Sequence, residues 1–425
     1  MKALIITYYW PPSGGSGVQR WLKFVKYLGD FQIEPVIYTV KNPNYAIEDL
    51  TLQNEVSENI EVIRQDIWEP NNLLSLFGSK KKEMSAGFLN PNPSFIGKVA
   101  QYIRANYFIP DARKYWIKPS VKYLTKYLVD NKIDIIITTG PPHSTHLIGL
   151  QLKEKLNIKW IADFRDPWTE IDYFHQLPLT KRSIEKHCQM EEEVLKNADS
   201  VLVVGKTMAN SFKKFTRNIE VITNGYDTNK KEKEVTLDEK FSIVHIGMLN
   251  SDRNHKILWK VLQEICLENK EFSEDLQLKF IGKLADDITR DIVKYKLQNY
   301  TIFFDYLAHH EVLQHQKSAQ VLLLSVNNVP SAKGIITGKL FEYLQANRPI
   351  LAIAPTNGDL AEIIKYTNSG ITIDFEDEIK LKNEILILYA NFKNNTLKVD
   401  SKNINKYHRK ELTKQLANII KEVIE

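Results

Sequence analysis

The chain has 425 residues, 43% of them hydrophobic, which is enough for two or three domains with ordinary cores and excludes a disordered protein. Its net charge of +5 is modest and no nucleic-acid-binding motif accompanies it, so we expect no nucleic-acid partner. The two cysteines, Cys188 and Cys266, stand far apart, which excludes a disulfide framework and a cysteine-based metal site.

The expected location of the chain is the cytoplasm. The apolar run at the N-terminus is too short for a signal peptide, and no small-residue cleavage site follows it. No apolar stretch reaches the roughly 20 residues that a transmembrane helix needs.

The first half of the sequence alternates short apolar runs with longer helical patterns. A helix is predicted at 18–28, where Val18, Leu22 and Val25 share one face. The apolar runs have the length of strands, and they lie at 2–7, 35–39, 133–138, 160–163 and 200–204. Runs this short and this apolar are typical of parallel strands covered on both faces, so we expect an α/β fold with a doubly wound sheet.

The same alternation starts again in the second half. Turn residues at 223–227 and a charged run at 230–234 indicate a linker. The second set of strands is predicted at 241–247, 276–282, 301–304, 321–325 and 350–354. We therefore predict two Rossmann-like domains facing each other across a cleft. They would span 1–210 and 236–400, with a linker region at 211–235 and a final helix at 405–425 that could return to the first domain.

The segment 331–354 is the most informative part of the chain. Gly334 and Gly338 allow a tight turn and a close approach to a ligand. The free N–H groups of a helix start, next to Lys339, make a site for phosphate. Glu342 lies one turn into the same helix, from where it can accept hydrogen bonds from the paired hydroxyls of a sugar. Phosphate and ribose binding at one loop predict a nucleotide-sugar site.

Polar loops also follow the strands of the first half. Gly14 and Gly15 lie in the loop after the first strand, without the spacing of a dinucleotide-binding fingerprint. His143 and His146 follow the strand at 133–138, and either could donate a hydrogen bond to a sugar hydroxyl. Asp166 lies in the segment ADFRDPWTE, whose density of charged and aromatic residues at a strand end favours a binding role over packing.

These segments together resemble the retaining, GT-B-type glycosyltransferases of family 4, best at 1–40, 133–228 and 331–370. Glu342 matches the glutamate that binds the ribose of the donor in that family. A second glutamate, which contacts the transferred sugar in many members, is replaced here by Gly334. ADFRDPWTE is similar to a segment on the acceptor side, where Asp166 would orient acceptor or sugar, and one of His143 and His146 would contact the transferred sugar.

The resemblance extends to the charges that hold the donor. It implies that Gly14 and Gly15 touch the donor phosphate. Arg253 matches one of two cations that bind the pyrophosphate; Met248 replaces the other, and Lys339 is expected to supply that charge. The segment 303–307 is similar to one that borders the nucleotide base, which places Tyr306 and Leu307 in the donor site.

The resemblance implies a metal-independent hexosyltransferase that needs no cofactor and uses a nucleotide-diphosphate sugar as donor. The implied product is a bacterial surface polysaccharide, built on a glycan or lipid-linked acceptor. Two alternatives stay open: a non-hydrolysing nucleotide-sugar epimerase, and a catalytically silent GT-B scaffold that binds a glycan or a protein partner.

A basic, aromatic stretch in the first half suggests a second partner. Between Ser79 and Lys132 there are eleven Lys or Arg and three acidic residues, a local excess of +8, interspersed with aromatic residues. This composition suits an anionic membrane surface, so peripheral contact with the inner face of the cell membrane is expected. A solvated helical face is the other interpretation.

Overall fold

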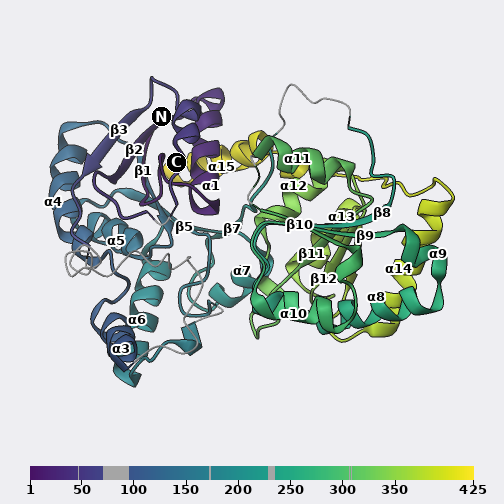
Figure 1. Cartoon of the computed structure of the whole chain (residues 1–425). Coiled ribbons are helices and arrows are strands. Elements are labelled where there is room, and N and C mark those ends of the chain that lie inside the picture. The colour runs from purple at the N-terminus through teal and green to yellow at the C-terminus, as the bar shows by residue number, and fades with distance from the viewer. Residues whose placement is uncertain (46, 70–94, 172–173, 228–234, 306, 308) are drawn as a thin grey trace. The chain divides into compact units, whose positions relative to one another are not determined.

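The computed structural model describes residues 1–45, 47–69, 95–171, 174–227, 235–305, 307 and 309–425. They form two compact units (Figure 1). The first unit comprises Met1–Asn224 and Arg409–Glu425, and the second comprises Gly225–His408. Tyr306, the part of the basic stretch before residue 95, and the charged linker run at 228–234 lie outside the described residues.

The first unit is built on a parallel sheet that, in the described residues, has seven strands in the order β3-β2-β1-β4-β5-β6-β7. The order reverses direction at β1, as in a doubly wound sheet. The strands are β1 Lys2–Ile6, β2 Glu34–Val40, β3 Glu61–Gln65, β4 Ile135–Gly140, β5 Lys159–Phe164, β6 Ser200–Val203 and β7 Ile219–Val221.

Helices cover both faces of this sheet, which explains why its central strands are apolar on both sides. Along β1, Leu4 and Ile6 belong to the core beneath one set of helices, and Ala3 and Ile5 to the core beneath the other. The first set is α4 Lys114–Asp130, α5 Ser144–Leu156, α6 Lys181–Asn197 and α7 Lys206–Phe212, and the second is α1 Ser16–Leu28 and α15 Arg409–Ile424.

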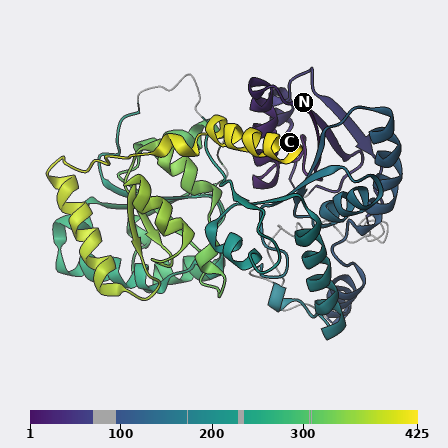
Figure 2. The same cartoon turned by 180° about the vertical axis from the view of Figure 1, so that it is seen from behind.

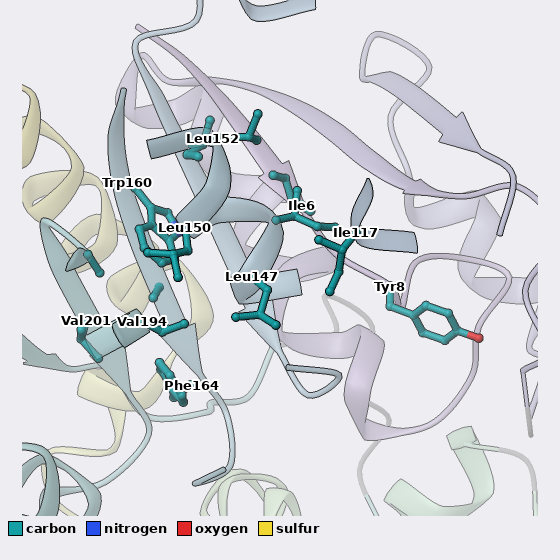
Figure 3. Close-up of a cluster of buried hydrophobic side chains, with 14 of the residues drawn as sticks. Ile6, Tyr8, Ile117, Leu147, Leu150, Leu152, Trp160, Phe164, Val194 and Val201 are labelled. Carbon is teal, nitrogen blue, oxygen red and sulfur yellow. The ribbon is translucent and has the colours of Figure 1, made fainter. Parts of the chain in front are cut away.

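Figure 3 shows the core on the side of α4, α5 and α6. Ile6 of β1 and Trp160 of β5 lie among leucine side chains of α5, with Ile117 of α4 close by. Tyr8, two residues beyond the end of β1, is fully buried and belongs to the same core. The loops that follow these strands therefore begin at strand ends that are packed into the core.

The helix α15 completes the first unit although it follows the whole second unit in sequence. Figure 2 shows it from behind, in yellow next to α1 in purple. Leu412, Leu416 and Ile420 are buried in the same core as the apolar face of α1. Lys410 also pairs with Asp30, at 2.7 Å. The return of the last helix to the first domain is thus as predicted.

The second unit has the same construction around a parallel sheet with six strands in the described residues, in the order β10-β9-β8-β11-β12-β13. The two Rossmann-like units of a GT-B fold are therefore confirmed. The strands are β8 Phe241–Ile246, β9 Leu276–Ile281, β10 Thr301–Phe304, β11 Val321–Ser325, β12 Ile350–Ile353 and β13 Gly370–Ile373.

Two layers of helices cover the second sheet as well. Along β8, Phe241 and Ile243 pack beneath α8 and α14, while Val244 and Ile246 pack beneath α12 and α13. The helices are α8 Lys256–Glu268, α9 Lys270–Asp275, α10 Asp286–Lys294, α11 His309–Ser318, α12 Gly338–Ala346, α13 Asp359–Thr367 and α14 Glu378–Lys393.

Candidate functional site

The start of α12 and the carboxyl end of β8 meet in the second unit. Gly247 follows β8 with a φ of +85°, a left-handed conformation that favours glycine. A Cβ atom there would lie 2.8 Å from Cε of Lys339, so the Lys339 side chain lies directly over the Gly247 backbone. Gly247 is thus a further glycine that allows a close approach at this end of the sheet, in addition to the predicted Gly334 and Gly338. No atom lies within 4 Å of the place of a Cβ on Gly338, which leaves open space at the start of the helix.

Two cations meet at the carbonyl oxygen of Met248. Lys339 Nζ donates to it at 3.4 Å and Arg253 Nη1 at 3.3 Å. Arg253 is also held by Asn327, whose side-chain oxygen accepts from Nε at 2.6 Å. The structure thus brings Lys339 and Arg253 together, although 86 positions (339 − 253) separate them in the sequence.

The position of the Arg253 loop is fixed by α8 and α10. Asn254 donates to Asp287 and Asp291 of α10 and accepts from the indole of Trp259, which is buried in the core. Ser251 donates to Asp287 as well. These side-chain hydrogen bonds hold the loop, and with it the backbone of Arg253, in one position.

The surroundings of Lys339 disfavour its charge. Part of the side chain is exposed, but the ammonium group lies against Gly247, His245 and Met248. This burial is the largest cause of a pKa lowered to about 7; the neighbouring Arg253 lowers the pKa further, and Glu342 opposes the shift. Two neighbouring cations, one of them with its charge disfavoured by burial, favour an anionic ligand.

Glu342 lies on the next turn of α12 and is half-buried. Its Oε2 accepts a hydrogen bond from Gln316 of α11 at 3.0 Å, and Gln316 is itself buried. The hydroxyl of Thr337, just before the helix, does not cap it and has no hydrogen-bond partner within the described part of the chain. Leu307 is half-buried and packs against the core under α12.

In the first unit, the loop after β1 is shaped around its glycines. Gly14 N–H donates to Ile47 O at 2.9 Å, and a Cβ on Gly14 would lie 2.8 Å from the Ile47 side chain. Gly15 has a φ of +81° and precedes α1. The backbone here approaches its neighbours more closely than a residue with a side chain would allow.

Arg165, in the loop after β5, connects the start of α1 with the end of β4. Its guanidinium donates to the carbonyl oxygens of Gly17 at 2.5 Å and Gly140 at 3.2 Å, and also to that of Pro141. Asp163 accepts from Arg20 at 2.9 Å and from Trp21 at 2.7 Å. Burial alone would raise the pKa of Asp163, but Arg20 and these hydrogen bonds hold it below its ordinary value.

Asp166 and the two histidines differ in exposure. Asp166 is exposed in the loop after β5. His146 is fully buried, stacks on Phe164 and shares a hydrogen bond of 2.9 Å with Thr138. His143 keeps 8% of its surface exposed and stacks on Trp168 at 4.7 Å. Burial holds the pKa of His143 well below its ordinary value and lowers that of His146 to about 3, so both imidazoles are neutral at physiological pH.

Comparisons with known proteins identify the group to which the chain belongs. A model described as Glycosyltransferase Family 4 matches residues 88–230, and a model described as Glycosyl transferases group 1 matches residues 240–391. The chain belongs to these glycosyltransferases. A search of curated proteins finds no match.

Several solved structures have the same fold as this glycosyltransferase, and their alignments extend over almost its whole length. Sucrose-phosphate synthase from Thermosynechococcus elongatus is 15% identical with a TM-score of 0.60, over 99% of this chain and 96% of that one. TarM is 13% identical with a TM-score of 0.62, over 99% and 98%. The lipopolysaccharide outer core galactosyltransferase WaaB is 13% identical with a TM-score of 0.58, over 99% of both chains.

An apolar surface of the glycosyltransferase lies on α3 (Phe95–Tyr107). Phe95 is 81% exposed and Tyr107 66%, and Tyr102 and Ile103 are exposed between them. The helix carries Lys98 and Arg104 and no acidic residue. We call this surface the α3 patch. In the part of the chain that the structure describes, no helix has the length and apolar character to cross a membrane.

His245 is a residue of the site that the sequence interpretation missed. It lies in β8, is 1% exposed, and faces Lys339 with Nε2 at 3.3 Å from Nζ. A signal was available, because an ionisable residue interrupts the apolar run FSIVHIG. Among the described residues, no group of three or more His, Cys, Asp or Glu side chains gathers closely enough to hold a metal ion.

Proposed function

We propose that this glycosyltransferase transfers a sugar from a nucleotide-diphosphate sugar to a glycan or lipid-linked acceptor, with retention of configuration and without a metal ion. The observation that supports this most directly is the meeting of Lys339 and Arg253 at the Met248 carbonyl, one helical turn from Glu342. Synthesis of a bacterial surface polysaccharide is the process that we propose for it, because WaaB, a lipopolysaccharide galactosyltransferase by its name, shares its fold.

The two cations would bind the diphosphate of the donor. As the glycosidic bond breaks, negative charge grows on the departing diphosphate, and cations already in place stabilise that charge without reorganising. The start of α12 adds backbone N–H groups and the positive end of the helix dipole. The Thr337 hydroxyl is a further donor at this point. In the first unit, Gly14 and Gly15 would bind phosphate with their backbone.

Glu342 would bind the ribose of the donor. One of its oxygens is fixed by Gln316, which orients the carboxylate. A carboxylate can accept from both hydroxyls of a ribose, and hydrogen bonds to a charged group are stronger than neutral ones. Tyr306 and Leu307 would border the base, and Gly338 leaves room at the helix start for the diphosphate.

On the acceptor side, we assign Asp166 to orienting the incoming hydroxyl, because it is an exposed carboxylate after β5. Of the two histidines, we assign the sugar contact to His143, since it retains some exposure while His146 is enclosed in the core. Neutral imidazoles at these positions can donate a hydrogen bond without introducing a charge beside the sugar.

The test of the donor site is the affinity for UDP, the nucleotide present in a TarM complex. Glu342→Ala should weaken UDP binding by roughly 2–4 kcal/mol in titration calorimetry, because two hydrogen bonds to a charged acceptor are lost. Glu376→Ala, which removes an exposed carboxylate from the same unit, should bind like the wild type. GDP is measured in parallel. If Glu342→Ala keeps the wild-type affinity for the nucleotide that binds, the ribose assignment is wrong.

The reaction class is tested with nucleotide sugars. Release of nucleoside diphosphate that requires an added acceptor, with a product of the same anomeric configuration as the donor, is the expected result. Formation of an epimer from the nucleotide sugar alone would instead identify an epimerase.

We propose that the α3 patch rests on the inner face of the cell membrane, where a lipid-linked acceptor is held. Apolar side chains flanked by cations suit an anionic lipid surface, to which each cation contributes about 1 kcal/mol. Binding to phosphatidylglycerol vesicles should therefore be strong at low salt and weaken as salt is added, while binding to phosphatidylcholine vesicles should be weak.

The contribution of the α3 patch can be separated from the charge of the whole chain. Phe95→Ser combined with Ile103→Ser should reduce vesicle binding at least about tenfold, because each buried side chain of this size is worth roughly 1.5–3 kcal/mol. Leu267→Ser is the matched control, since Leu267 is 79% exposed on α8 of the second unit. Equal loss in both variants, or no binding at low salt, would refute a membrane role for the α3 patch.

A further inference from the structure

His245 makes two hydrogen bonds from opposite sides of its ring. Nδ1 lies 3.1 Å from the carbonyl oxygen of Leu323 in β11, and Nε2 lies 3.3 Å from Nζ of Lys339. The ring is 1% exposed within the sheet, so its orientation is set by β8 and its neighbours and does not depend on solvent.

The Leu323 carbonyl favours a proton on Nδ1, because a carbonyl oxygen can only accept. The backbone of Met248 also interacts with the ring. We assign the proton to Nδ1 because Nε2 faces the ammonium group of Lys339, which can only donate. Nε2 then holds a lone pair that points at Lys339. Burial and the charge of Lys339 hold the pKa of His245 well below its ordinary value, which keeps the ring neutral and this lone pair available.

Lys339 is therefore placed by groups from several elements. The neutral ring of His245 in β8 and the Met248 carbonyl after it accept from the ammonium group, while Arg253 repels it and Glu342 on α12 attracts it. Without the His245 acceptor, Nζ would keep its hydrogen bond to the Met248 carbonyl, and Arg253 donates to that same oxygen.

We propose that His245 is a positioning residue: by accepting a hydrogen bond at Nε2, it keeps the Lys339 side chain protonated and next to Arg253, ready for the diphosphate of the donor. The proposal rests on the donor site described above, because it assigns the role of His245 through Lys339. In this role His245 forms no covalent bond and transfers no proton. Lys339 takes its proton from solvent.

The first experiment measures the protonation of Lys339 without any ligand. A limiting amount of acetic anhydride acetylates only the neutral amine, so the extent of Lys339 acetylation against pH, followed by mass spectrometry, gives the midpoint of its titration. His245→Phe removes the acceptor and should move this midpoint down by about one pH unit, the size expected for a lost hydrogen bond to a charged group. His245→Gln offers an oxygen in place of Nε2 and should restore the wild-type midpoint.

A merely structural role for His245 would leave this midpoint unchanged in a folded His245→Phe protein, and that result would overturn the proposal. His255→Phe is the matched control, because His255 is also buried in the second unit but bonds to the Val326 carbonyl and not to Lys339. UDP affinity should fall about tenfold in His245→Phe and recover in His245→Gln. If neither UDP nor GDP binds the wild type, the donor site is wrong, whereas the acetylation profile still decides whether His245 acts on Lys339.

The second experiment does not use His245→Phe and therefore serves if that variant does not fold. Nitrogen-15 NMR of labelled histidines, with the His245 signals assigned from their loss in His245→Gln, should show a protonated Nδ1 and an unprotonated Nε2 between pH 6 and 8. A proton on Nε2 would leave Lys339 without its acceptor and would refute the proposal.

Discussion

The two cations of the proposed donor site, Arg253 and Lys339, differ in how firmly they hold their charge. Arg253 keeps its charge at any physiological pH and is held by Asn327. Lys339 is a cation whose charge depends on what surrounds it, since its pKa is lowered to about 7 by burial and by Arg253. One permanent charge and one adjustable charge therefore meet at the Met248 carbonyl, where we propose that the diphosphate binds.

This difference predicts a pH-dependent affinity. Lys339 is protonated below pH 7 in the free protein and loses its charge above it, and a bound diphosphate favours the charged form. UDP affinity should therefore be highest below pH 7 and fall as the pH rises through 7, with a slope of up to about tenfold per pH unit. Titration calorimetry from pH 6 to 9 measures it.

Two variants check the source of this slope. Lys339→Arg keeps a charge throughout the range and should flatten the profile, while Lys365→Arg, on an exposed position of α13, should keep it. A slope that persists in Lys339→Arg would assign the pH dependence to another group.

Sequence reasoning proposed site residues whose types are typical of the chemistry, and it did not name residues that contact them from inside strands and helices. Glu342, Lys339 and Arg253 stand at strand ends and a helix start, where ligands of α/β proteins bind. His245 and Arg20 lie inside a strand and a helix, and their partners, Lys339 and Asp163, are distant in sequence. Only the fold brings such pairs together, so their roles could not be derived from spacing.

At the scale of elements, the central strands were predictable, and three of the four edge strands were not. The run 321–325 coincides with the central strand β11. The run 301–304 coincides with β10, an edge strand that was found because its sequence, TIFF, is still an apolar run. The strands β3, β7 and β13 were missed, and each is the outermost strand of its sheet. Their residues are mostly half-buried or exposed, so their sequences lack the continuous apolar run by which a central strand is found.

The helix α15 predicts a stability effect at the end of the chain. Leu416 is fully buried against the sheet of the first unit, and Leu416→Ala should lower the free energy of unfolding by about 2–5 kcal/mol. Lys414→Ala, at an exposed position of the same helix, should change it by no more than about 0.5 kcal/mol. Urea unfolding followed by tryptophan fluorescence and circular dichroism measures both, and equal effects would show that α15 does not contribute to the core.

At the scale of the whole molecule, the proposed chemistry predicts activity without a metal ion. Lys339 and Arg253 supply the positive charge for the leaving diphosphate, so EDTA should leave sugar transfer by the purified protein unchanged. Arg253→Ala and Lys339→Ala should each lower kcat by roughly 10²–10³-fold, because the charge that they stabilise grows in the transition state. Loss of activity in EDTA that Mn²⁺ or Mg²⁺ restores would contradict the metal-free mechanism.

The crossing of α15 back to the first unit also orders events during protein synthesis. The ribosome makes residues 1–224 first, yet the face of their sheet that α15 covers must wait while the entire unit Gly225–His408 is translated. Through that interval the apolar face of α1 that packs against α15 lacks its partner. The second unit is completely synthesised at His408, before the helix α15 that the first unit needs. The second unit can therefore complete its fold before the first unit does, although the first unit is synthesised earlier.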